Sequence, residues 1–327
     1  MTTYYVDPAA GGSNDGTDWT NAWTSLQSAA DTAVAGDIVY CRGTETLSAA
    51  IDFDTNDGTA AGGFIKFLGC NASGNVDGTR YVLDGDSSAA ACVVPGGVDF
   101  VWLENFELTG STGAGFGPAT ANTKDWVLVN VYSHSNSGHG FDYYNMASLA
   151  SVFAIRCQAI NNGNRGAARM DGARFLFCSF SDNADAGLIN TEYCMFIGCI
   201  VHNNGSDGVE CDAPCWLVNC VIDENDDNGI AAGVGDLLLS IGCRITDNGK
   251  DTSGYGINVT SGRVVCGWNF FDGNDSGTTN GNVDVIPYDS DTDTNETSGT
   301  EGYTDGASDD FNLTSEATLR SVAIELD

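Results

Sequence analysis

Four acidic side chains, with one arginine beside the first, are the strongest candidates for chemistry in this sequence. They are Asp171, Glu192, Glu210 and Asp212, and the arginine is Arg169. Two carboxylates about 5–9 Å apart can cleave a glycosidic bond by acid–base chemistry. We expect no cofactor, with a structural calcium ion as the alternative, because the same oxygens can hold Ca²⁺. A chain with 45 acidic residues also produces such groups on a solvated acidic face, and that interpretation stays open.

The segments that must position these side chains repeat along the chain. A cysteine recurs every 21 residues, the last after 23, and an asparagine follows each one by five. The cysteines are Cys157, Cys178, Cys199, Cys220 and Cys243, and the asparagines are Asn162, Asn183, Asn204, Asn225 and Asn248, with Asn136 and Asn274 extending the series. Such a period predicts stacked units that bury their apolar faces against their neighbours. We expect a core stack of reduced thiols and a ladder of turn asparagines.

Within each repeat, apolar residues alternate in the manner of strands. The columns on either side of the cysteines are Ile155, Leu176, Ile197, Val218 and Ile241, and Ala159, Phe180, Val201, Ile222 and Ile245. This period-two pattern predicts that both columns face a core. A second short strand starts at Leu188, Val209 and Ile230. A leucine-rich repeat needs an apolar residue two positions after the asparagine, where this chain has polar ones. The sequence therefore predicts an all-β, right-handed parallel β-helix.

Positions that should be polar on the outside of these strands are apolar. They are Phe177, Ile200 and Val221, flanked by Phe175, Phe196 and Leu217. Strands that are apolar on both faces are usually covered on both sides, and an exposed apolar stripe marks an interaction surface. We expect these six residues to form the interface of a homotrimer. The alternative is that a loop of the same chain covers them.

The two ends differ from the repeats and suggest three domains. Residues 1–45 predict an N-terminal cap, in which Leu26, Ala29, Ala30 and Ala33 have helical spacing. A cap is needed because exposed strand edges invite pairing with other chains. Residues 46–286 form the predicted β-helix, with about 21–26 residues per coil. Residues 287–327 are expected to be a linker and a C-terminal docking tail.

The opening of the chain resembles a known family. It contains Tyr4-Tyr5-Val6-Asp7-Pro8, Asn14-Asp15-Gly16, Trp19 and Ala35-Gly36-Asp37-Ile38-Val39-Tyr40. This is similar to the N-terminal cap of β-helix proteins of the pectin-lyase-like superfamily. That resemblance implies either a secreted bacterial polysaccharide enzyme or a bacteriophage spike or capsid decoration.

The same resemblance calls attention to Gly138-His139-Gly140, since glycoside hydrolases of the superfamily carry a Gly-His-Gly segment. Those relatives also have paired aspartates and a downstream Arg-Ile-Lys. Here Asp226-Asp227 follows the histidine instead of preceding it, and no Arg-Ile-Lys occurs after it. We therefore interpret His139 as a residue of a glycine-rich turn.

Charge narrows the classes of partner. Twelve basic residues against 45 acidic ones give a formal charge of -33, which disfavours nucleic acids and anionic membranes. The start of the chain has no basic region followed by an apolar stretch. We therefore expect synthesis in a host cytoplasm, and the alternative is a secretory signal that was cut away before a start Met was added.

Together these features favour a structural virion protein of a bacteriophage. We expect a homotrimeric capsid decoration, cement protein or short spike that contacts phage capsid or tail proteins and a host glycan. A first alternative is a secreted, extracellular polysaccharide lyase or glycoside hydrolase acting on an extended glycan. A second is a bacterial surface or adhesive protein.

Overall fold

The protein is described by a computed structural model, which covers residues 1–120, 123–144, 146, 152–233, 236–250, 254–260, 262–281, 283–285 and 295–297. It divides into two compact units, Met1–Ser179 and Phe180–Asp327, which are treated separately below. Of the predicted linker and tail, only residues 295–297 fall within the described part of the chain.

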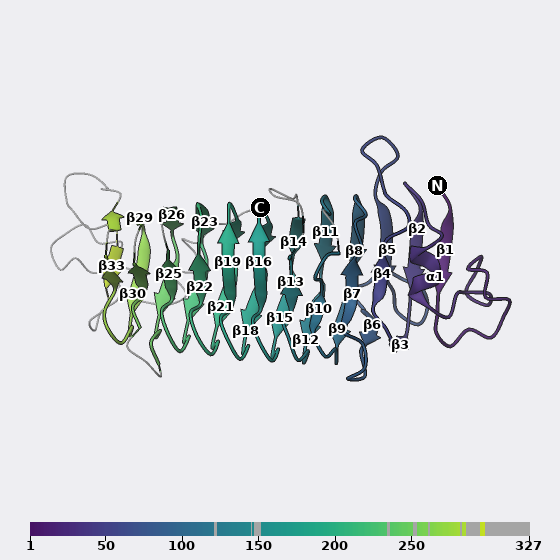
Figure 1. The fold of residues 1–327 in the computed structure, drawn as a ribbon, viewed down its shortest axis with the longest axis horizontal. Helices are drawn as coiled ribbons and strands as arrows, with labels where there is room; N and C mark the ends of the chain where they lie inside the picture. The colour runs from purple at the N-terminus through teal and green to yellow at the C-terminus, as the bar shows by residue number, and fades with distance from the viewer. Residues whose placement is uncertain are drawn as a thin grey trace. The chain divides into compact units, whose positions relative to one another are not determined.

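Both units are built from three parallel β-sheets, A, B and C, and each coil contributes one strand to each sheet. Within a unit, successive strands of one sheet lie side by side (Figure 1). Because each parallel pair is joined by a chain segment that travels through the other two sheets, the connections wind into the predicted right-handed parallel β-helix.

The strands of the first unit follow this order closely. Sheet A contains β1 (Thr3–Val6), β2 (Ile38–Cys41), β5 (Ile65–Gly69), β8 (Val101–Glu104), β11 (Trp126–Val129), β14 (Val152–Ile155) and β17 (Arg174–Leu176). Sheet B contains β3 (Thr44–Thr46), β6 (Tyr81–Asp84), β9 (Phe106–Thr109), β12 (Tyr132–His134) and β15 (Gln158–Ile160). Sheet C contains β4 (Ile51–Phe53), β7 (Ala91–Pro95), β10 (Ala114–Phe116), β13 (Phe141–Asp142) and β16 (Ala167–Asp171).

The second unit repeats the pattern, and β18 (Ser179–Ser181) contains the boundary residues. Sheet A contains β20 (Met195–Ile197), β23 (Cys215–Val218), β26 (Asp236–Ile241), β29 (Gly262–Gly267) and β32 (Val283–Val285). Sheet B contains β21 (Ile200–His202), β24 (Val221–Asp223), β27 (Arg244–Thr246), β30 (Asn269–Asp272) and β33 (Asn295–Thr297). Sheet C contains β19 (Leu188–Glu192), β22 (Val209–Cys211), β25 (Ile230–Ala232), β28 (Ile257–Val259) and β31 (Thr279–Asn280).

A short helix closes the N-terminal end of the first unit, as the sequence predicts. Helix α1 spans Leu26–Ala30 and begins after Ser25, whose side chain accepts a hydrogen bond from the backbone N–H of Gln27. The Leu26 N–H donates to Glu45 Oε2 at 2.9 Å, and the Tyr81 hydroxyl donates to the same oxygen at 2.6 Å. Glu45 is buried, so this carboxylate joins the cap helix to strands β3 and β6.

Sheets A and B are joined by single residues in the left-handed conformation. Arg156 and Phe177 do this in the first unit, with φ of 53° and 56°, and Asn219 does so in the second, with φ of 52°. A left-handed residue redirects the chain sharply, and the inward–outward alternation restarts after it. The cysteine that follows each corner is the first inward residue of sheet B, and it is buried.

This restart overturns part of the predicted arrangement. Phe175, Phe196 and Leu217, predicted to face outward, point into the core with 0–1% of their surface exposed. The column of Ile155, Leu176, Ile197, Val218 and Ile241, predicted to face the core, is half-buried on the outside of sheet A. If alternate residues are counted straight through the corner, the inward and outward residues of every sheet A strand are exchanged. The same count assigns the inward and outward residues of sheet B correctly.

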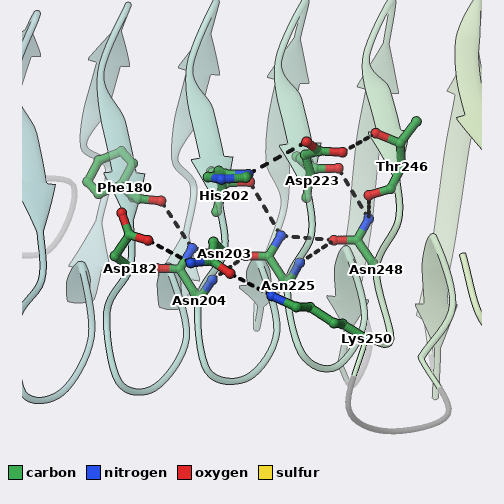
Figure 2. Close-up of polar contacts among 12 residues, drawn as sticks. Phe180, Asp182, His202, Asn203, Asn204, Asp223, Asn225, Thr246, Asn248 and Lys250 are labelled. Carbon is green, nitrogen blue, oxygen red and sulfur yellow. Dashed lines mark hydrogen bonds and ion pairs between the residues drawn. The ribbon is translucent and has the colours of Figure 1, made fainter. Parts of the chain in front are cut away.

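The asparagines lie in the turns between sheets B and C, where all are buried except Asn274, which is half-buried. In the first unit, Asn136 Nδ2 donates to Asn162 Oδ1 at 3.0 Å. Figure 2 shows the corresponding contacts of the second unit, where Asn204 Nδ2 donates to Asn225 Oδ1 and Asn225 Nδ2 donates to Asn248 Oδ1, both at 2.9 Å. The side-chain amides of Asn136, Asn204, Asn225 and Asn248 also donate to backbone carbonyls of sheet B strands, so the ladder satisfies buried polar groups.

Candidate functional site

The most unusual polar contact in the first unit joins Asp142 to Arg169 on the outside of sheet C. Asp142 ends strand β13 and is 3% exposed. Arg169 Nε donates to Asp142 Oδ1 at 2.9 Å, and its Nη2 donates to Oδ2, which makes the contact bidentate. The backbone N–H of Tyr144 donates to Oδ1 as well, at 3.1 Å. Charged and neutral donors together therefore fix this buried carboxylate in place.

Arg169 reaches this carboxylate from a strained backbone. Its φ is +59°, and it lies in the middle of strand β16, between Ala168 and Met170. The left-handed residues at the corners of the coil turn the chain, whereas this one interrupts a strand. A non-glycine residue in this region costs about 1–2 kcal/mol, and such strain is concentrated at functional sites.

Tyr144 completes the cluster with an aromatic ring. The Arg169 guanidinium carbon lies 4.5 Å from the centroid of that ring, and Tyr144 is 49% exposed. The side chain before it, Tyr143, points the opposite way and packs edge-on against Phe175 in the core, with centroids 6.0 Å apart. Anchored in this way, the turn presents one face of Tyr144 to the guanidinium while half of its surface remains accessible.

The neighbouring coil has a glycine at the point where it lies closest to strand β13. Gly117, with φ of +88°, lies so close to strand β13 that a Cβ atom there would be 1.8 Å from the Asp142 carbonyl oxygen. The backbone N–H of Ala119 donates to the Tyr144 carbonyl at 3.0 Å. Only glycine fits at position 117, and the site is therefore held by backbone contacts as well as by the ion pair.

This arrangement suits binding better than proton transfer. The oxygens of Asp142 are occupied by donors of Arg169 and by the backbone N–H of Tyr144. The guanidinium side chain is 39% exposed, so part of its donor fork still faces solvent beside an exposed ring. A flat, partly apolar ring next to fixed N–H donors can recognise a sugar ring and its hydroxyl groups.

The four predicted carboxylates lie on strands of sheet C or directly after one. Asp171 is half-buried at the end of β16, two residues after Arg169. In the second unit Glu192 is exposed, and Glu210 and Asp212 are half-buried. The Asp212 N–H donates to the Thr191 carbonyl at 3.2 Å, so Asp212 and Glu192 follow paired positions of neighbouring coils.

Within the described residues, no three His, Cys, Asp or Glu side chains gather in a way that could hold an ion. His139 is half-buried in the turn before β13, and its carbonyl accepts a hydrogen bond from the Gly115 N–H at 3.0 Å. In the part of the chain that the structure covers, no helix is long and apolar enough to cross a bilayer.

Sequence reasoning missed Asp142 and Tyr144. The available signal was the 26-residue step between Asn136 and Asn162, which marks a coil with an insertion. Strand β13 lies in that coil. Insertions in a solenoid fall on one face, which is often the binding face.

Comparison with known proteins identifies the fold and leaves the activity open. No protein-family model matches the chain, and no curated protein matches it in sequence. Among solved structures, pectate lyase Pel9A is similar, with a TM-score of 0.63, 18% identity, and coverage of 90% of this chain and 79% of that one. The A-module of the mannuronan C-5 epimerase AlgE6 of Azotobacter vinelandii has a TM-score of 0.57, 16% identity, and coverage of 81% and 90%. A rhamnogalacturonan lyase has a TM-score of 0.53, 17% identity, and coverage of 84% and 74%. The fold is thus the pectate-lyase-like right-handed parallel β-helix.

Proposed function

We propose that this protein binds a polysaccharide along sheet C of its first unit, at the site formed by Asp142, Arg169 and Tyr144. The observation that carries the proposal is the strained arginine, held by a buried carboxylate beneath a half-exposed tyrosine ring. The three similar structures support it, because each is named for an enzyme of a polysaccharide. Since the oxygens of Asp142 are already occupied by the donors of Arg169 and Tyr144, we propose binding without cleavage.

Charge indicates what kind of polysaccharide fits. Asp142 neutralises Arg169, and the chain as a whole carries a formal charge of -33. A neutral glycan should therefore bind independently of salt. An acidic glycan should bind more tightly as added salt screens its repulsion by the protein.

The decisive experiment compares two tyrosines of matched exposure. Tyr144 is 49% exposed at the site and Tyr193 is 47% exposed in the second unit. Calorimetric titration with a panel of neutral and acidic polysaccharides should show that Tyr144→Ala weakens binding by about fivefold or more, since the cation–π platform is worth about 1 kcal/mol. Tyr193→Ala should bind as the wild type does. Equal affinities in both variants, or no binding to any polysaccharide, would refute the proposal, and release of unsaturated sugars would refute the absence of cleavage.

A second proposal is that the protein is part of a bacteriophage particle, as a homotrimeric capsid decoration or spike that could present the glycan site to a host. Apolar residues outside the core favour an assembly: Phe177 is 51% exposed, Ile200 is 46% exposed and Val221 is half-buried. Purified virus particles probed with an antibody to this chain test the location. Recovery of the protein only from bacterial cell surfaces, or only from culture medium, would instead favour the adhesive protein or the secreted enzyme.

A further inference from the structure

The end of strand β12 in the first unit joins a serine, a histidine and a glutamate in one line of contacts. Ser135 Oγ lies 3.1 Å from His134 Nδ1. Across the ring, His134 Nε2 lies 3.1 Å from Glu107 Oε1. His134 ends β12, and Glu107 lies on β9, the neighbouring strand of sheet B (Figure 1). Hydroxyl, imidazole and carboxylate in this order form the arrangement in which a base activates a nucleophile and a third group orients the base.

The contact with Glu107 decides which nitrogen of the ring acts as the base. A carboxylate oxygen accepts hydrogen bonds, so in the neutral imidazole Nε2 carries the hydrogen and donates it to Glu107. Nδ1 then carries the lone pair, and this is the nitrogen within reach of the Ser135 hydroxyl. Once His134 has taken the hydroxyl proton, the Glu107 carboxylate stabilises the positive ring. The contacts therefore select the tautomer that can activate the serine.

An aromatic ring also holds the imidazole in place. The rings of Tyr132 and His134 stack with their centroids 4.2 Å apart and their planes at 24°. Tyr132 is held in turn by Arg80, whose guanidinium carbon lies 5.1 Å from the ring centroid and whose Nη2 donates to Asn130 Oδ1 at 2.7 Å. The His134 side chain is 20% exposed. The base is thus fixed at one edge by a carboxylate and on one face by a ring, and most of it is shielded from water.

The serine is accessible and has a strained backbone. Ser135 is exposed, and its φ is +54°. The neighbouring coils have Gly110 and Asn161 at the equivalent position, and both residue types accept the left-handed region more readily than serine does. Strain of this kind is concentrated at functional sites. The position therefore presents a hydroxyl to solvent at the cost of a less favourable backbone.

Asn161 places a side-chain amide beside the serine. Strands β12 and β15 pair in register, so Ser135 and Asn161 directly follow the paired residues His134 and Ile160. The Ser135 N–H donates to the Asn161 carbonyl at 3.2 Å, and Asn161 is exposed. With about 4.8 Å between neighbouring strands, its amide can reach an oxygen bound next to Ser135 Oγ. Such an amide can donate to the negative oxygen that forms when a hydroxyl attacks a carbonyl.

We propose that Ser135, His134 and Glu107 hydrolyse a carboxylic ester. Ser135 Oγ attacks the ester carbonyl carbon while its proton passes to His134 Nδ1, and the alcohol takes that proton as its bond to the carbonyl carbon breaks. Water then attacks the acyl group on Ser135 and gives a proton to His134. The bond to Oγ breaks, the acid is released, and the proton returns to Oγ. The net reaction converts ester and water into acid and alcohol.

The charge of the protein indicates which esters fit. A formal charge of -33 repels anionic substrates, so we expect an uncharged ester to react faster than an anionic one. The inference goes beyond glycan binding and does not depend on it, because the contacts that carry it lie on sheet B and its turn. Ester hydrolysis also leaves the glycosidic bonds of any bound polysaccharide intact.

The first test measures release of p-nitrophenol from p-nitrophenyl acetate by the full chain. We expect hydrolysis above the rate in buffer, and labelling of Ser135 by a fluorophosphonate probe, located by mass spectrometry of peptides. Ser135→Gly suits the left-handed backbone and removes the nucleophile, so it should lower kcat/KM by about 100-fold or more. Ser137 is an exposed serine of the same turn, and Ser137→Ala should behave as the wild type does.

The second test addresses Glu107 as a positioning residue. A glutamine amide can donate to Nε2 and so favour the wrong tautomer of His134. Glu107→Gln should therefore lower kcat by about tenfold or more while KM changes by less than about twofold. Glu104 is a half-buried glutamate that ends β8 in the same coil, and Glu104→Gln should keep the wild-type rate. Circular dichroism of each variant establishes that the coil is folded.

The opposite results overturn the proposal. A wild type that neither exceeds the rate in buffer nor takes up the probe at Ser135 has no nucleophile there. Full activity in folded Ser135→Gly would assign the hydrolysis to another group. Equal rates in Glu107→Gln and Glu104→Gln would show that Glu107 does not orient the base. Faster hydrolysis of a negatively charged ester would contradict the assignment of an uncharged substrate.

Discussion

Removing one rung of the asparagine ladder tests the physical account of the coil most directly. Asn204 is fully buried in the second unit. Its Nδ2 donates to the Phe180 carbonyl at 3.0 Å (Figure 2). Its Oδ1 accepts from the Asn183 backbone N–H at 3.2 Å and from Asn183 Nδ2 at 2.9 Å. Asn204→Ala removes these three contacts and the bond from Nδ2 to Asn225 Oδ1, which keeps the Asn204 backbone N–H as a donor. The Phe180 carbonyl and the two Asn183 groups lose their bonds to the Asn204 side chain.

The magnitude follows from those contacts. A buried polar group that loses its partner costs about 1–3 kcal/mol, so three such groups should cost about 3–5 kcal/mol after partial relaxation. The whole free energy of unfolding of a domain is typically about 5–15 kcal/mol. Asn204→Ala should therefore shift the midpoint of urea unfolding strongly, as followed by circular dichroism.

The neighbouring asparagine supplies the control. Asn203 has φ of +52°, and its amide bonds Asp182 and Lys250 near the surface. Glycine accepts that backbone conformation, so Asn203→Gly should change the free energy of unfolding by about 0.5 kcal/mol or less. If Asn204→Ala costs no more than Asn203→Gly, the buried ladder does not stabilise the coil and the reasoning is wrong.

Three further predictions concern thiols and the cap. All twelve cysteines are buried and free, so a thiol reagent should react with almost none in the native protein and with twelve in denaturant; fast native reaction would contradict the thiol stack. Burial raises the pKa of Cys92 to about 12 and that of Cys70 to about 11. Since these values lie above the unfolded pKa of about 8.5, the thiols stabilise the fold below that pH, and under reducing conditions the urea midpoint should fall as the pH rises from about 9 to 12. A flat pH profile would contradict this. Glu45→Ala should lower the free energy of unfolding by about 2–4 kcal/mol, because Leu26 N–H and the Tyr81 hydroxyl both lose a buried acceptor, whereas a melting curve like that of the wild type would show that the cap is held otherwise.

The regularity of the coil could be predicted because each repeat faces the same environment as the next. Cys157 and Asn162 recur in their columns since one inward position and one turn position are used again in every coil. The phase of sheet A could not be predicted in this way. Leu176 and Phe175 are both apolar, and only the left-handed φ of 56° at Phe177 decides which of them faces the core.

The candidate site was less predictable for a similar reason. Asp142 and Arg169 are 27 residues apart, in a part of the chain where the repeat length changes. The shared strand register of β13 and β16 brings them within reach of each other. Nothing in the local sequence of either residue marks the partner.

Repeat length and alternation are enough to specify the architecture of this protein. Period-two alternation and a repeat of about 21 residues demand stacked parallel strands, because no single coil can bury its own apolar face. Tertiary structure alone decided which apolar column is outside and which charges meet. Both depend on backbone conformation at single corner residues and on the register between coils. Side-chain identity repeats along the chain, but its direction is set only when the chain has turned.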